Sequence, residues 1–375
     1  MSNINSKQHY QLLDGLRGVA AIMVVCYHIF EGFAFAELTN QVGDGLIRTL
    51  NHGYLAVDFF FLLSGFVIQY AYSDRWNNIY TLTFFKRRLI RLHPMLVMGS
   101  LIGLICFLIG GSQQWNGTAI PLYISIITFI LTCFMIPALP NSFNEVRGNG
   151  ELFPLNGPMW SLFFEYIGNI LYAFFIRRLS TKLLSYLVLL LGILHTAFSL
   201  GNLSGYGSIG VGWTFDSINF LGGMLRMLFP FTLGMLICRG FKPIKIKYPF
   251  LVCSIILITA LSIPYLPGQN IISFNGLYES LCVIVVFPLI LQIGASAGNN
   301  ESSKTSKILG EISYPLYIIH YPIMYIFYQW LIKTQQYTLK ETYLIVILVV
   351  LLSIVLAFVL SRLYDIPLRK RLMKK

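Results

Sequence analysis

The chain has 375 residues, of which 56% are hydrophobic and only 11% are charged. A soluble domain carries about 25% charged residues, so this composition excludes an ordinary water-soluble fold and predicts a membrane protein. The net charge of +12 does not indicate nucleic-acid binding, because the basic residues form short clusters between apolar runs and not one continuous basic face.

Eleven apolar runs, each long enough to be a candidate membrane span, follow one another along the chain. They cover residues 15–31, 54–73, 94–111, 120–137, 160–176, 183–200, 218–238, 249–266, 277–294, 308–332 and 343–364. Eleven crossings would place basic clusters such as Arg177, Arg178 and Lys182 outside the cell, against the positive-inside rule. We therefore expect 120–137 to be a re-entrant or interfacial segment, which leaves about ten spans and puts both termini in the cytoplasm.

This pattern predicts an all-α, polytopic transmembrane helical bundle that forms a single domain over residues 1–375, in the inner or plasma membrane. The six cysteines lie in apolar runs without a Cys-x-x-Cys pair. Neither a disulfide framework nor a metal site is therefore indicated.

The first apolar run carries Arg17 and His28, eleven positions apart. At about 100° per residue this separation is close to three full turns, so both side chains are expected on one helix face, about 16 Å apart in depth. Ionisable residues are costly in the hydrocarbon and usually face a cavity or a partner. The pair therefore predicts an anion site near the cytoplasmic surface and a proton acceptor deeper in the membrane. The alternative is that Arg17 is a snorkelling anchor and His28 a packing residue.

The second run opens with Asp58, followed by Ser64 and Gly65, a small-residue notch that lets helices approach closely. A basic stretch, FFKRRLIRLHP, comes next, and we expect the following helix to begin at Pro94. Its arginines fit a topology signal, and they also fit a phosphate clamp, because arginine binds phosphate through two parallel hydrogen bonds.

The run that begins at Trp160 carries Glu165 about one turn inside the helix. Trp160 is expected to be an interfacial anchor at the level of the headgroups, and Glu165 needs a partner. Later runs add further intramembrane polar candidates, Arg226, Glu279 and His320. We expect His195 to be a packing histidine.

Six motifs in this order resemble the membrane-bound acyltransferase 3 family, whose members O-acylate cell-surface glycans and related acceptors. The motifs are the Arg-x10-His pair Arg17/His28, VDFFFLLSGF, RLIRLHP, PMWSLFFE, LGEISYPLYIIH and the terminal YDIPLRKR. The resemblance runs from Leu13 to about Leu372, and Asp365-Ile366-Pro367 stands where the family often has Glu-x-Pro. It implies an integral-membrane O-acyltransferase that moves an acyl group, expected to be acetyl, from cytosolic acetyl-CoA to a hydroxyl of a cell-surface or lipid-linked saccharide.

The resemblance also implies roles for individual residues. His28, Arg17 and Glu165 would be catalytic, and Arg17, Arg88 and Arg91 would hold the acyl donor. His28 would act either as a general base on the acceptor hydroxyl or as a nucleophile that transiently carries the acyl group. Many larger relatives append an extracytoplasmic hydrolase-like domain; none follows the last predicted span here, so the membrane domain or a separate partner is expected to modify the acceptor.

A secondary transporter is the competing function, because charged residues in membrane helices also form proton relays and substrate sites. Transporters commonly contain two related halves, and no segment of the second half repeats the Arg17/His28 pattern. The expected partners are acyl-CoA, a saccharide or lipid-linked glycan and the lipid bilayer, with no nucleic acid. Trp213, Tyr206 and Phe143 in the expected outer loops are candidates for stacking on sugar rings, although interfacial aromatic belts explain such residues equally well.

Overall fold

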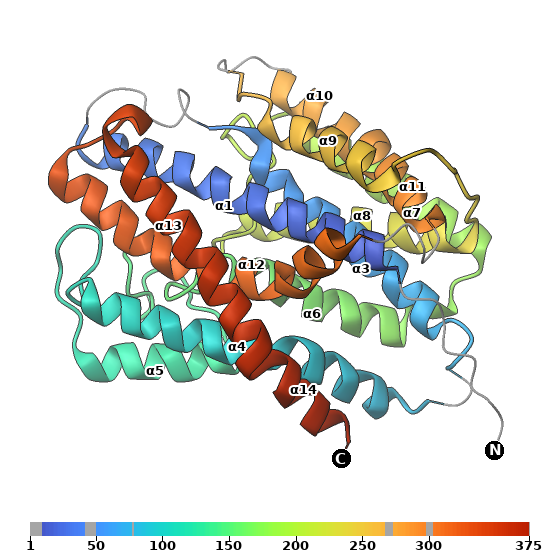
Figure 1. Ribbon diagram of the computed structural model, residues 1–375, viewed down its shortest axis with the longest axis horizontal. Coiled ribbons are helices and arrows are strands. Elements are labelled where there is room, and N and C mark those ends of the chain that lie inside the picture. Colours follow the sequence, from blue (N-terminus) through green and yellow to red (C-terminus); the bar gives the residue numbers. More distant parts are fainter. Residues whose placement is uncertain (1–9, 42–49, 77–78, 267–272, 298–302, 375) are drawn as a thin grey trace.

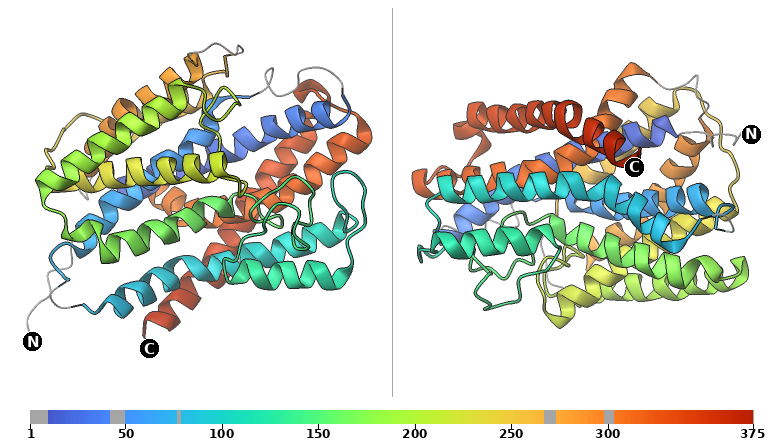
Figure 2. Two further views of the ribbon diagram at one scale, coloured as in Figure 1. Left: turned by 180° about the vertical axis from the view of Figure 1, so that it is seen from behind. Right: turned by 90° about the horizontal axis from the view of Figure 1, so that it is seen from below.

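The computed structural model describes residues 10–41, 50–76, 79–266, 273–297 and 303–374. Within these ranges all the regular secondary-structure elements are helices, and β-structure is limited to three isolated bridges. The predicted all-α bundle is therefore confirmed. Figures 1 and 2 show the helices packed side by side, with the start of α1 and the end of α14 toward the same end of the bundle.

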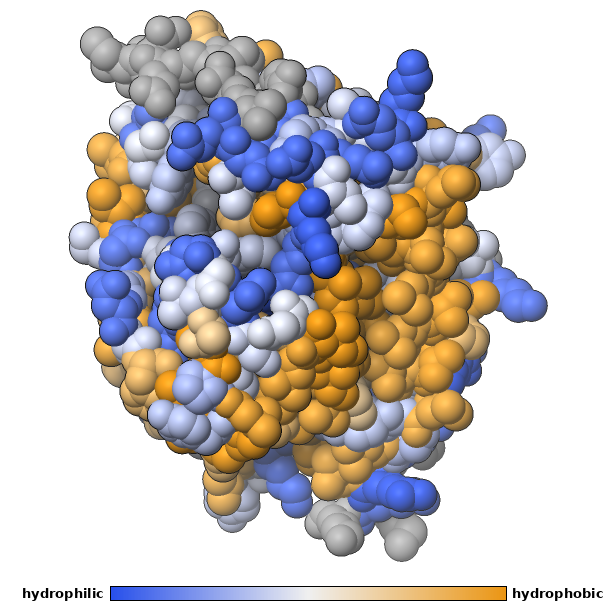
Figure 3. Space-filling view, turned by 90° about the vertical axis from the view of Figure 1, so that its left-hand side faces the viewer, coloured by the Kyte–Doolittle hydropathy of each residue, from blue (hydrophilic) through white to orange (hydrophobic). Residues whose placement is uncertain are grey.

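The helices follow one another in this order: α1 (Gln11–Thr39), α3 (Ala56–Tyr72), α4 (Thr81–Ile109), α5 (Leu122–Cys133), α6 (Met159–Phe174), α7 (Thr181–Leu200), α8 (Ser217–Arg239), α9 (Pro249–Ser262), α10 (Phe274–Leu281), α11 (Phe287–Ser296), α12 (Lys304–Thr334), α13 (Leu339–Leu360) and α14 (Ile366–Met373). The main packing pairs are α1 with α12 and α3 with α8. On the face seen in Figure 3, hydrophilic residues gather across the upper and left part, and apolar residues cover much of the right and lower part.

Eight helical segments of the described chain are long and apolar enough to cross a membrane. The helices α5 and α9, with 12 and 14 residues, reach only about 18 and 21 Å at 1.5 Å per residue, which is less than the roughly 30 Å of a bilayer core. The shortness of α5 fits the re-entrant or interfacial segment predicted at 120–137. The count of ten spans stays a prediction.

The expectation that a helix begins at Pro94 is wrong, because α4 begins at Thr81 and continues through this proline. Proline removes a backbone donor and disturbs the turn before it. Two tyrosine hydroxyls from other helices donate to carbonyls close to this proline, Tyr314 to Leu92 at 2.5 Å and Tyr364 to Pro94 at 3.2 Å. The basic residues of FFKRRLIRLHP therefore lie on a helix and not in a loop.

The predicted notch beside Ser64 is confirmed at Gly65, where α3 meets α8. A Cβ added to Gly65 would lie 1.9 Å from the carbonyl oxygen of Phe231, which is far inside van der Waals contact. Only a glycine permits this approach of the two backbones. The close seam brings Asp58 on α3 next to Arg226 on α8.

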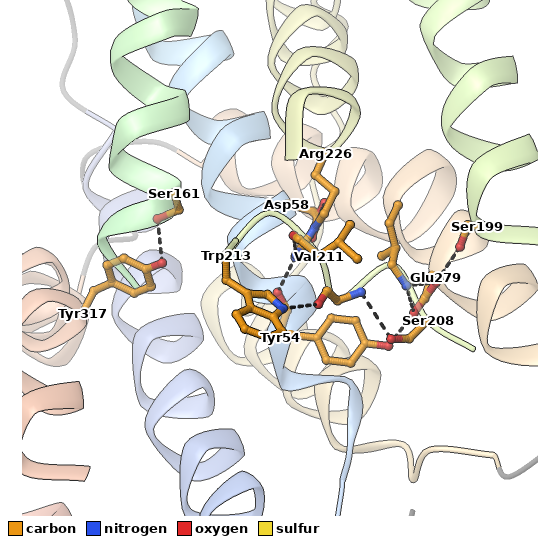
Figure 4. Close-up of polar contacts among 12 residues, drawn as sticks. Tyr54, Asp58, Ser161, Ser199, Ser208, Val211, Trp213, Arg226, Glu279 and Tyr317 are labelled. Atoms are coloured by element: carbon orange, nitrogen blue, oxygen red, sulfur yellow. Dashed lines mark hydrogen bonds and ion pairs between the residues drawn. The ribbon is translucent and has the colours of Figure 1, made fainter. Parts of the chain in front are cut away.

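Arg226 and Asp58 form a buried ion pair that has a full set of hydrogen bonds (Figure 4). Nη2 of Arg226 lies 2.7 Å from Oδ2 of Asp58, and Nε lies 3.2 Å from Oδ1. The same guanidinium donates to the carbonyls of Val211 at 2.9 Å and Tyr54 at 3.0 Å. The pair thus joins α3 and α8 to the segment that precedes α8.

Glu279 on α10 accepts hydrogen bonds at a second buried position in the same region (Figure 4). Its donors are the hydroxyl of Tyr54, the hydroxyl of Ser199 at 2.5 Å, and the backbone N–H of Ile209 at 2.9 and 3.0 Å. Asp58, Arg226 and Glu279 are therefore partnered groups that hold the loop between α7 and α8 against α3 and α10.

We predict that Arg226→Met and Asp58→Asn each destabilise the protein by about 3–5 kcal/mol, because either change leaves an unpaired charge or an unmatched polar group in the interior. The double variant Asp58→Leu/Arg226→Met should recover most of this loss. Unfolding in mixed micelles measures the effect.

The control is Arg362→Met, which breaks the more exposed Arg362–Glu311 pair and should cost less than about 1 kcal/mol. A double variant as unstable as the single ones would contradict the prediction.

Candidate active site

A cavity of about 350 Å³ lies among α1, α3, α4, α6, α12 and α14. We call it the arginine cavity, because Arg17, Arg88 and Arg91 all line it. The sequence predicted that these three residues form one donor site, and the structure brings them together from two helices. Their role in binding stays a prediction.

Ion pairs hold two of the three arginines in place. Nη1 of Arg17 lies 2.8 Å from Oδ1 of Asp14, one turn earlier on α1. Nη2 of Arg88 lies 2.6 Å from Oε1 of Glu165, and the hydroxyl of Ser64 donates to the same oxygen at 2.8 Å. Both guanidinium groups are thus fixed while they face the cavity.

Arg91 and Lys307 also line the arginine cavity and are exposed. Among the ion pairs of the described residues, neither takes part. Five cationic side chains (Arg17, Arg88, Arg91, Lys307 and Arg369) and four carboxylates (Asp14, Glu165, Glu311 and Asp365) line the cavity, so cations are in excess by one. Lys307 was missed in the sequence, because an isolated lysine near the start of α12 looked like one more topology signal.

A second cavity of about 330 Å³ is lined by α1, α12 and the loops before α6 and α8. We call it the histidine cavity, because His28 lines it. Nδ1 of His28 lies 2.6 Å from Oε2 of Glu31 on the same helix. The hydroxyls of Tyr328 and Tyr321 lie 3.0 and 3.3 Å from that oxygen. An ionised carboxylate only accepts hydrogen bonds, so beside an ionised Glu31 the proton of a neutral His28 lies on Nδ1, and Nε2 is an acceptor.

Glu31 was missed in the sequence analysis, although the signal was present. A spacing of three residues places Glu31 next to His28 on one helix face. His320, which the sequence marked, stacks on His28 with ring centroids 5.2 Å apart. The stacked ring and the carboxylate together fix the orientation of the His28 imidazole.

Glu165 does not lie beside His28. It lines the arginine cavity and is occupied by Arg88 and Ser64, whereas His28 lines the histidine cavity. This position suits a residue that orients Arg88. The carboxylate of Glu165 and the imidazole of His28 thus belong to different cavities.

Aromatic side chains dominate the wall of the histidine cavity. Tyr321, Tyr325 and Tyr328 come from one face of α12, and Trp115 and Trp213 come from loops. Of the loop aromatics that the sequence marked, Trp213 lines this cavity. Tyr206 and Phe143 are exposed and line neither cavity.

The expectation that Trp160 anchors the protein at the headgroups is wrong, because this side chain is only 8% exposed and lines the histidine cavity. The loop before α8 covers its ring at Gly212, which has φ +114°; an added Cβ there would lie 2.7 Å from the indole. The guanidinium of Arg226 lies 5.0 Å from the ring centroid. His195 is buried and packs on Phe229, as expected.

The two cavities adjoin, because Val57 on α3 and Tyr317 on α12 line both of them. Arg17 and His28, predicted to share one face of α1, therefore face two neighbouring cavities from one helix. The side chains of Val57 and Tyr317 stand between the two cavities.

The carboxyl of Glu151, in the loop that precedes α6, provides a test of how this loop is buried. It lines the histidine cavity and accepts hydrogen bonds from Tyr325 and from Asn149, the latter at 3.0 Å. Burial raises the pKa of Glu151 to about 7, although the hydrogen bonds and the charge of Arg147 oppose this shift.

Because the pKa of Glu151 is higher in the folded than in the unfolded protein, folding takes up a proton between about pH 5 and pH 7. The stabilisation contributed by the neutral Glu151 carboxyl is therefore fully present at low pH, and about 3 kcal/mol of it is lost as the pH rises through this window. We predict that Glu151→Gln gains melting temperature relative to wild type as the pH is raised from 5 to 8. A difference between the two proteins that does not change with pH would contradict this assignment.

Comparison with known proteins supplies a family and relatives. A family model described as an acyltransferase domain matches residues 10–362. Protein 2 in the picA locus of Rhizobium radiobacter is 33% identical over 181 residues, which is 47% of this chain and 86% of that protein. Acyltransferase MdmB of Streptomyces mycarofaciens is 36% identical over 111 residues, 28% of this chain and 27% of MdmB.

The O-acetyltransferase OatA of Staphylococcus aureus is 24% identical over 390 residues, which covers 99% of this chain and 59% of OatA. The matched part of the chain thus spans less than two thirds of OatA and about a quarter of MdmB. No solved structure matches.

Proposed function

Because this chain belongs to the acyltransferase 3 family and is a multi-pass membrane O-acyltransferase, we propose that it transfers an acetyl group from acetyl-CoA to a hydroxyl of a cell-surface or lipid-linked saccharide. The donor occupies the arginine cavity and the acceptor occupies the histidine cavity. The observation that carries this proposal is that the two cavities adjoin at Val57 and Tyr317.

The charge of the arginine cavity supports a CoA donor. The phosphates of CoA need cations, and Arg91 and Lys307 stand outside the ion pairs of the described chain while they line the cavity. Arg17 and Arg88, held by their carboxylates, add oriented N–H donors. The pantetheine arm of CoA is long and uncharged, so it extends from these cations toward Tyr317.

The wall of the histidine cavity supports a saccharide acceptor. Aromatic rings pack against the apolar faces of sugars, and tyrosine and tryptophan also offer hydrogen-bond donors. Nine such residues line the cavity around His28, together with Glu31 and Glu151: Tyr27, Tyr54, Trp115, Trp160, Trp213, Tyr317, Tyr321, Tyr325 and Tyr328. A cavity with this lining binds a sugar ring and presents its hydroxyl to the imidazole.

The transfer step follows from the His28–Glu31 pair. Nε2 of His28 takes the proton of the acceptor hydroxyl while the hydroxyl oxygen attacks the thioester carbonyl carbon. A C–O bond forms, the C–S bond breaks, and the thiolate of CoA leaves and takes the proton from the imidazolium. Glu31 stabilises the imidazolium between these events, because its carboxylate lies 2.6 Å from Nδ1.

We further propose that the arginine cavity faces the cytoplasm in the cell membrane, because acyl-CoA is a cytosolic compound. The positive-inside rule supports this orientation, since basic residues of α4, α12 and α14 surround the cavity. The transporter alternative loses support, because the relatives MdmB and OatA are named as acyltransferases.

We predict that His28→Ala lowers acetyl transfer by about 10²–10⁴-fold, because general-base catalysis is lost. Glu31→Gln should lower it by a smaller factor, since the imidazole stays but loses its carboxylate partner. The measurement follows label from acetyl-CoA into the glycan fraction of membranes that contain equal amounts of each protein.

His195→Phe is the matched control, because His195 is buried and lines neither cavity; transfer should stay near the wild-type rate. Wild-type activity in the His28→Ala protein would overturn the mechanism. Stoichiometric release of CoA without acceptor would show that His28 carries the acyl group as a nucleophile instead.

A further inference from the structure

We propose that Val57 and Tyr317 form a passage between the two cavities that selects the size of the acyl group. This inference rests on the proposed function, because it assigns the size selection to the point where donor and acceptor meet. The two side chains come from different helices, and both are 6% exposed. They are the residues common to the linings of the arginine and histidine cavities.

Contacts to the hydroxyl and to the ring hold the side chain of Tyr317 in the passage. Its hydroxyl lies 2.7 Å from Oγ of Ser161 and 3.3 Å from the carbonyl oxygen of Pro158, both at the start of α6 (Figure 4 shows the Ser161 contact). Phe60 packs edge-on against the ring, with centroids 5.4 Å apart. Ordered contacts on this scale keep the ring from swinging aside, so the opening has a fixed size.

Tyr317 also lies close to the histidines along α12. Its ring centroid is 6.1 Å from that of His320, which in turn stacks on His28 at 5.2 Å. A thioester carbonyl that reaches Tyr317 is therefore close to the histidine that activates the acceptor. The passage is next to the reacting atoms and not at a distant entrance.

Val57 and Tyr317 limit the acyl group through the room they leave at the end of the histidine cavity that the acyl tail enters, since both side chains line that cavity. In an acyl-CoA that enters from the arginine cavity, the acyl tail precedes the carbonyl, so it passes Val57 and Tyr317 first. The tail must then share the histidine cavity, of about 330 Å³, with the acceptor. An acetyl group brings one methyl group, whereas each further methylene must fit beside the sugar. Discrimination between substrates that differ by one methylene is typically about 10–200-fold.

The test compares transfer from acetyl-CoA and butyryl-CoA in membranes that contain the full chain. We expect Val57→Ala and Tyr317→Leu to raise the ratio of butyryl to acetyl transfer about tenfold or more. Tyr317→Phe keeps the ring and should keep the wild-type ratio, because the ring, not the hydroxyl, sets the opening. Val25→Ala is the matched control, since Val25 is buried on α1 and lines neither cavity.

An unchanged ratio in Val57→Ala, with acetyl transfer retained, would overturn the inference even if Tyr317→Leu failed to fold. The same tenfold rise in Val25→Ala would overturn it too, because any loosened packing would then have this effect. A wild-type protein that transfers neither acyl group would instead overturn the proposed function, and the inference with it.

Discussion

The interaction on which this structure depends is the pairing of ionised groups inside a membrane bundle. An isolated charge in the hydrocarbon costs several kcal/mol, so each one must meet a partner or a cavity that holds water or ligand. Asp58 and Arg226 neutralise each other's charge in an almost fully buried ion pair. Together with the bonds from Arg226 to the carbonyls of Val211 and Tyr54, this pair holds α3, α8 and the loop before α8 together. The ionisable side chains Arg17, His28 and Glu31 of α1 line the two cavities.

The need to pair buried charges also distinguishes two kinds of cation in the arginine cavity, those held in ion pairs within the protein and those available to a substrate. Arg17 and Arg88 are oriented by carboxylates, whereas Arg91 and Lys307 lie outside the ion pairs of the described ranges. The polyanionic donor that we propose would bind here through its phosphates, because the lining of the cavity has an excess of positive charge. On the other side, Glu31 is surrounded by hydroxyl donors that stabilise a carboxylate beside His28. The helix α1 thus carries Arg17 into the arginine cavity and the His28–Glu31 pair into the histidine cavity.

Much of this arrangement was predictable from the sequence, and the failures have physical causes. Helical periodicity places Arg17 and His28 on one face of α1 whatever the rest of the chain does. The pairing of Asp58 with Arg226 was not predictable, since 168 positions separate them and only the packing of α3 against α8 joins them. Pro94 was assigned to a helix start because proline lacks the N–H that a helix interior requires, whereas α4 continues through it within a packed bundle. Trp160 was assigned to the headgroups, since a loop that covers it leaves no local signal.

The most direct test of the account is the side from which the donor enters. Membranes from cells that contain the protein can be prepared as inside-out or right-side-out vesicles, and acetyl-CoA does not cross a sealed bilayer. The account predicts that labelled acetyl-CoA added outside is used by inside-out vesicles, with the label on glycan protected in the lumen. Right-side-out vesicles should transfer label only after permeabilisation. Equal transfer by sealed right-side-out vesicles would contradict a cytoplasmic arginine cavity that is joined to the histidine cavity across the membrane.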